Sequence, residues 1–96
     1  MEIPNKISLF DKTYKIIQCS KHDLTCKGCG EECIGKWDED KKTIYVSLDD
    51  EDVTPQLIYL HELGHIFAFY YGLGKNEIIA EAFAQFVNSV LEQSNE

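Results

Sequence analysis

The sequence predicts an α+β fold, in which a small antiparallel β-sheet is followed by a helical hairpin. Three observations support this prediction. Short stretches with alternating apolar residues fill the first half of the chain. Two longer apolar segments fill the second half, and a proline start and a glycine-containing end bound the first of them. The chain of 96 residues has the size of one domain, residues 1–96.

The strand region covers residues 1–48. Segments 6–10 and 13–19 flank a polar pair and are expected to form a β-hairpin. Residues 34–48 contain two further strands, joined across positions 38–42. Ile44, Val46 and Leu48 alternate with polar or half-polar neighbours, which gives the last strand one apolar face.

The helical hairpin covers residues 54–95. Thr54 is the expected N-cap, with Pro55 at the first helical position, and the first helix should end near Tyr71. This helix is apolar nearly all round, so it is expected to be buried between the sheet and another element. A second helix is expected from Asn76 to Gln93. Its predicted core stripe is Ile79, Phe83, Phe86, Val87 and Val90.

The motif HELGH lies within the first predicted helix. His61 and His65 are four residues apart, so they share one helix face and can bind one metal ion. Glu62 points about 100° away from His61, where it can act as general base on a metal-bound water. Burying these groups unpaired would cost several kcal/mol each. The motif therefore predicts a metal site rather than a core helix with incidental polar residues.

A third protein ligand must come from elsewhere, because catalytic zinc usually has three. Two glutamates on the second helix are candidates. Glu81 and His65 are each eight residues from Leu73, near which the hairpin is expected to turn, so Glu81 is favoured. Glu77 falls in the first helical turn, where an acidic residue often only complements the helix dipole, and it is the alternative.

HELGH followed by a glutamate on a second helix resembles the gluzincin metallopeptidases. It resembles more closely the small ImmA/IrrE-like and phage-encoded HExxH proteins. Their ExxA signature is matched both at 77–80 and at 81–84. The resemblance covers about residues 40–95 and implies a minimal zincin-like fold. It also implies a protein of the bacterial or phage-infected host cytosol.

The same resemblance implies the roles of the site residues. His61 and His65 would be zinc ligands, with Glu81 or, alternatively, Glu77 as the third. Glu62 would be the catalytic base that activates the zinc-bound water for attack on an amide carbonyl.

A cluster of four cysteines suggests a second metal site. In a reducing cytosol such a cluster favours metal binding over disulfides. The segment CKGCG has the shape of a zinc knuckle, and His22 could replace one thiolate. The alternatives are thiols without a metal or a redox CxxC. A structural zinc is therefore expected in the loop 19–33, held by Cys19, Cys26, Cys29 and Cys33.

The charge of the chain limits its partners. Net charge is −8, and all nine basic residues are lysines. Without arginine and with an acidic surface, binding to nucleic acid is not expected, whereas a basic partner protein or peptide is favoured. No apolar run approaches the roughly 18 residues of a membrane span, and the N-terminus lacks signal-peptide organisation. A cytosolic location is expected.

Two functions are compatible with these features. The first is a zinc-dependent hydrolase, a metallopeptidase that holds a peptide or protein substrate along an exposed strand edge, for which segment 43–48 is the candidate. The second is a non-catalytic, zinc-stabilised protein-binding module or phage-derived regulator. Glu62 distinguishes them, because catalysis needs it and a structural zinc does not.

Overall fold

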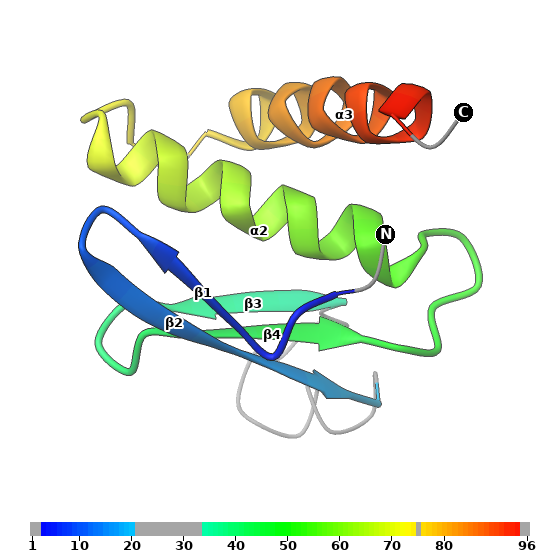
Figure 1. The fold of residues 1–96 in the computed structure, drawn as a ribbon, viewed down its shortest axis with the longest axis horizontal. Coiled ribbons are helices and arrows are strands. Elements are labelled where there is room, and N and C mark those ends of the chain that lie inside the picture. Colours follow the sequence, from blue (N-terminus) through cyan, green and yellow to red (C-terminus); the bar gives the residue numbers. More distant parts are fainter. Residues whose placement is uncertain (1–2, 21–33, 75, 95–96) are drawn as a thin grey trace.

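The computed structural model describes residues 3–20, 34–74 and 76–94. These residues form a four-stranded sheet followed by two packed helices, which confirms the α+β class. Helix α2 lies between the sheet and helix α3 (Figure 1). The elements are β1 Lys6–Leu9, β2 Lys12–Cys19, β3 Gly35–Asp38, β4 Thr43–Ser47, α2 Pro55–Tyr70 and α3 Glu77–Ser94.

The sheet is mixed, with strand order β1-β2-β4-β3. The two hairpins, β1–β2 and β3–β4, are antiparallel as predicted, but β2 and β4 pair in parallel. The prediction of a wholly antiparallel sheet is thus wrong for the β2–β4 pairing. Turn residues specify a hairpin but not how two hairpins pair with each other. The prediction that segment 43–48 is an exposed edge is also wrong. Strand β4 is interior, and the edge strands are β1 and β3.

The core lies where the sheet meets α2. Tyr14 and Ile16 of β2 are buried, as are Ile44 and Val46 of β4. They pack into one cluster with side chains of α2: Ile58, Tyr59, Leu60 and Ile66. Tyr14 and Ile16 are two residues apart in β2 and the residues beside them are exposed, which is the expected pattern for a strand covered on one face.

Local capping residues set the ends of α2. The Thr54 hydroxyl accepts a hydrogen bond from the Leu57 N–H at 3.3 Å, and Pro55 occupies the first turn, as predicted. At the other end Gly72 adopts a left-handed conformation with φ 70°. This conformation favours glycine and ends the helix. No helix in the described part of the chain is long and apolar enough to cross a membrane.

Helix α3 packs on α2 through small residues. A Cβ atom at Gly64 would lie 2.8 Å from the Cα and carbonyl oxygen of Ala80, so the two backbones approach closely there. Ala80 and Ala84 are buried, whereas Phe86 and Val90 are 71% and 47% exposed. The predicted core stripe is therefore wrong for Phe86 and Val90, because the close approach turns the alanine face of α3 toward α2. The stripe's other members are partly buried: Ile79, Phe83 and Val87.

Candidate metal centre

A cleft of about 1150 Å³ lies between β3, α2 and α3. It brings together every residue that the sequence singled out around HELGH. His61, Glu62 and His65 line it from α2, and Glu77 and Glu81 line it from α3. Strand β3, which lines one wall of this cleft, is an edge strand of the described sheet.

His61, His65 and Glu77 form a group that could hold a metal ion. Their ligand atoms all lie within 4.8 Å of one another. The Glu77 carboxylate contacts both imidazoles: Oε2 is 2.9 Å from His61 Nε2, and Oε1 is 3.2 Å from His65 Nε2. Two imidazole nitrogens and one carboxylate are a donor set that suits zinc with one position left open.

Glu81 contacts the same site from a different side. Its Oε2 lies 3.1 Å from His61 Nδ1, and its Oε1 accepts a hydrogen bond from Gln85 at 2.9 Å. The Gln85 hydrogen bond and, against the effect of burial, the contact with His61 lower the pKa of the Glu81 carboxyl. His61 is thus held between two carboxylates, with Glu77 at Nε2 and Glu81 at Nδ1.

The position of α3 explains why both glutamates reach the site. The helices make close contact at Gly64 and Ala80, so this contact, and not a turn at Leu73, sets which residues face each other. Glu77 is 71% exposed and Glu81 58% exposed at the side chain, while His65 is only 8% exposed. The carboxylates are therefore the part of the site that is most accessible to solvent.

Glu62 lies beside the histidines and against β3. It is buried, with 8% of its surface exposed. A Cβ atom at Gly35 would lie 3.1 Å from Glu62 Oε2 and 2.6 Å from Ile58 Cγ2. The absence of a side chain at Gly35 therefore leaves the space that the Glu62 carboxylate occupies between α2 and the edge strand. Its role as general base stays a prediction.

Sequence reasoning missed aromatic and acidic residues that also line the cleft. Trp37 and Phe69 line it and meet edge to face, with ring centroids 5.2 Å apart. Glu39 lines it too. The strand period offered a signal for one of them. Residues two apart in a strand share a face, so Trp37 belongs on the face of Gly35.

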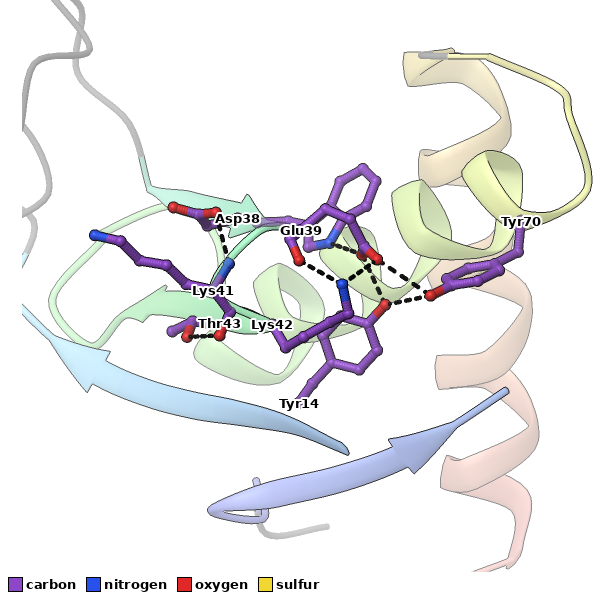
Figure 2. A network of polar contacts seen from close by, with 8 residues as sticks. Tyr14, Asp38, Glu39, Lys41, Lys42, Thr43 and Tyr70 are labelled. Atoms are coloured by element: carbon purple, nitrogen blue, oxygen red, sulfur yellow. Dashed lines mark hydrogen bonds and ion pairs between the residues drawn. The ribbon is translucent and has the colours of Figure 1, made fainter. Parts of the chain in front are cut away.

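Glu39 anchors the β3–β4 turn through a polar network (Figure 2). Tyr14 and Tyr70 donate their hydroxyls to the carboxylate at 2.7 and 3.1 Å, and Trp37 donates its indole N–H at 3.1 Å. Lys42 pairs with it at 2.8 Å. Burial raises the pKa of Glu39, but the hydrogen bonds from Lys42, Tyr14, Tyr70 and Trp37 outweigh it and lower the pKa. The network joins β2, the β3–β4 turn and the end of α2.

The predicted zinc knuckle falls mostly outside the described residues. Cys19 ends β2, where its Sγ lies 3.9 Å from the Val46 carbonyl oxygen. Cys26, Cys29 and Cys33 lie outside the described ranges, as does His22. The structural zinc site stays a prediction.

No protein-family model, curated protein or solved structure matches this chain significantly. The support for an HExxH-like site therefore comes from two features of this chain alone. These are the spacing of His61 and His65 on one helix, and a glutamate from the next helix within contact of both.

Proposed function

We propose that this protein is a zinc-dependent hydrolase, a metallopeptidase that cleaves an amide bond of a peptide or protein. The observation that carries the proposal is the meeting of the His61, His65 and Glu77 group with the buried Glu62 in one cleft. A purely structural metal would need no general base, whereas Glu62 supplies a buried carboxylate in the same cleft.

In this proposal His61, His65 and Glu77 hold the ion. When bound, zinc supplies Lewis acidity that polarises the substrate carbonyl and acidifies water. Glu81 would position His61 rather than bind the ion, because a carboxylate at Nδ1 favours the tautomer with its proton on Nδ1, in which Nε2 is free to act as a ligand. Glu77 is preferred over Glu81 as the third ligand since it alone of the two contacts both imidazoles.

Glu62 performs the proton transfers. Its carboxylate takes a proton from water as the new carbon–oxygen bond forms, and then gives that proton to the amine nitrogen as the carbon–nitrogen bond breaks. General-base catalysis contributes about 100- to 10,000-fold to a rate. Burial between α2 and β3 limits the positions that the Glu62 carboxylate can adopt for this transfer.

The substrate lies along β3 in this proposal. An edge strand presents unpaired backbone N–H and C=O groups, and an extended peptide can pair with them as an additional strand. Strand β3 is an edge and lines the metal cleft through Gly35, Lys36 and Trp37. A peptide paired with it would pass the carboxylate of Glu62 and the two histidines.

The Glu62→Gln variant tests the proposal. Zinc content by elemental analysis and the circular dichroism spectrum should be unchanged, because Glu62 is not a proposed ligand. Hydrolysis of a peptide library, followed by mass spectrometry, should fall by at least about 100-fold. The exposed Glu92→Gln on α3 is the matched control and should keep full activity.

Two outcomes would contradict hydrolysis. One is a fully zinc-loaded protein that cleaves no member of the library. The other is a Glu62→Gln variant as active as the unsubstituted protein. Either result would favour the zinc-stabilised binding module.

A further inference from the structure

Seven aromatic rings form a continuous chain of contacts that joins β3, the C-terminal half of α2, the β1–β2 turn and α3. Successive ring centroids lie between 4.4 and 6.0 Å apart. We call this chain of rings the aromatic belt. In order along it, the rings are Trp37, Phe69, Tyr70, Phe10, Tyr71, Phe67 and Phe83.

The aromatic belt begins inside the metal cleft and ends outside it. Trp37 and Phe69 line the cleft. From Phe69 the rings continue across the C-terminal end of α2 to the β1–β2 turn, which lies beside that end of the helix (Figure 1). A ligand in the cleft could therefore extend onto the belt without crossing other surface.

Much of the belt is exposed to solvent. The exposed fractions are 45% for Phe10, 51% for Phe69 and 62% for Tyr71, whereas the core aromatics Tyr14 and Tyr59 have at most 2%. Contiguous exposed apolar surface marks interaction sites, and Phe, Tyr and Trp are enriched at protein interfaces.

Phe10 provides a second, independent observation. It sits in the two-residue loop between Leu9 and Lys12, with φ 52°, followed by Asp11 with φ 65°. Such a loop favours Asn or Gly at both positions, and the left-handed conformation is unfavourable for a bulky side chain. Strained backbone of this kind concentrates at functional sites. The competing explanation is that the Phe10 stack on Tyr70, at 4.4 Å, only anchors the hairpin to α2.

Charge indicates the chemistry of the partner. The chain carries −8 overall. Among the described residues that line the cleft, the carboxylates are Glu39, Asp52, Glu62, Glu77 and Glu81, and the lysine is Lys36. Such a surface attracts cationic segments, and aromatic faces bind lysine and arginine through cation–π contacts. A second copy of this acidic chain would be repelled.

We propose that the aromatic belt docks a protein segment with lysine or arginine among apolar side chains, adjacent to the residues that enter the metal cleft. The position of the segment relative to the cleft rests on the proposed peptidase function. Docking itself needs no turnover, so binding can be measured on the Glu62→Gln variant.

The binding test uses a short synthetic peptide of alternating Leu and Arg, and a matched peptide with Glu in place of Arg. Fluorescence anisotropy at physiological salt should show binding of the first and not of the second. Phe10→Asn and Tyr71→Ser should each weaken binding about tenfold, as truncation of an aromatic anchor does. Ile78→Ser is the control, because Ile78 is 80% exposed on α3 and outside the belt.

The thermal stability of Phe10→Asn separates docking from anchoring. Asparagine suits the left-handed turn, so a docking role predicts weaker binding with an unchanged or higher unfolding temperature. A lower unfolding temperature with unchanged peptide affinity would assign Phe10 to anchoring the hairpin and overturn the proposal. It would equally be overturned by no binding of the Leu/Arg peptide, or by equal loss in Ile78→Ser. Self-association of the unsubstituted protein that Tyr71→Ser abolishes would assign the belt to a second copy instead.

The docking surface and the peptidase can fail separately. Suppose that the belt variants lose peptide binding while the zinc-loaded protein hydrolyses no peptide. This result would support the docking surface and contradict the peptidase proposal. Hydrolysis of cationic peptides with an unaltered KM in Phe10→Asn and Tyr71→Ser would do the reverse.

Discussion

Glu77 and Glu81 stand one helical turn apart, yet they contact different nitrogens of His61. If Glu77 is the ligand and Glu81 positions the ring, Glu77→Ala should weaken zinc binding more than Glu81→Ala does. Loss of an outer carboxylate typically reduces metal affinity about 10- to 100-fold. Competition with a chromophoric zinc chelator measures both affinities. A greater loss in Glu81→Ala would make Glu81 the third ligand.

The single residue Glu39 makes the free energy of unfolding depend on pH. Glu39→Gln removes the charge that accepts the hydrogen bonds of Tyr14, Tyr70 and Trp37, and the free energy of unfolding should fall by about 1 to 3 kcal/mol at neutral pH. The pKa of Glu39 is lower in the folded protein than in the unfolded chain. Its contribution is therefore full above the unfolded pKa, about 4.3, and is lost as pH falls through the folded value.

Urea denaturation at a series of pH values measures this contribution. The difference between the unsubstituted protein and Glu39→Gln should be constant near neutrality and shrink below about pH 4.3. Asp40→Asn, at an exposed position in the same turn, is the matched control and should show little difference. A difference that grew as pH fell would contradict the network in Figure 2.

At the scale of elements, the contact between α2 and α3 decides the geometry of the site. Replacing glycine by alanine at an exposed helical position raises the free energy of unfolding by about 1 kcal/mol. At Gly64 the added Cβ would lie 2.8 Å from the Ala80 backbone, so Gly64→Ala should instead destabilise the fold by about 1 to 3 kcal/mol. Because α3 carries Glu77, zinc affinity should fall as well. Denaturation and zinc titration check both, and a stabilised variant with normal affinity would contradict the contact.

At the scale of the whole molecule, the number of zinc ions tests both predicted sites together. Elemental analysis should find two ions per chain, since HELGH and the cysteine cluster occupy separate halves of the sequence. His65→Ala and Cys29→Ser should each leave one. Chelation should lower the unfolding temperature, because a ligand bound only to the folded state stabilises it. A count of one zinc ion per chain that does not change in Cys29→Ser would contradict the predicted zinc knuckle.

The sequence by itself determined the features that depend on neighbouring residues. The alternation within β2, the Thr54–Pro55 helix start and the spacing of His61 and His65 are all consequences of backbone geometry within one segment. The positions of the strands, both helices and the histidine pair could therefore be predicted before any long-range contact was known.

Only the tertiary structure decided the features that join distant segments. The parallel pairing of β2 with β4 makes β3 the edge beside the cleft, and no turn residue encodes that pairing. Close approach at Gly64 turns Ala80 and Ala84 inward and leaves Phe86 exposed, although periodicity alone favoured the larger residue. The same approach brings Glu77 to both histidines. These outcomes depend on how surfaces far apart in the sequence fit each other, which the spacing of residues within one segment does not specify.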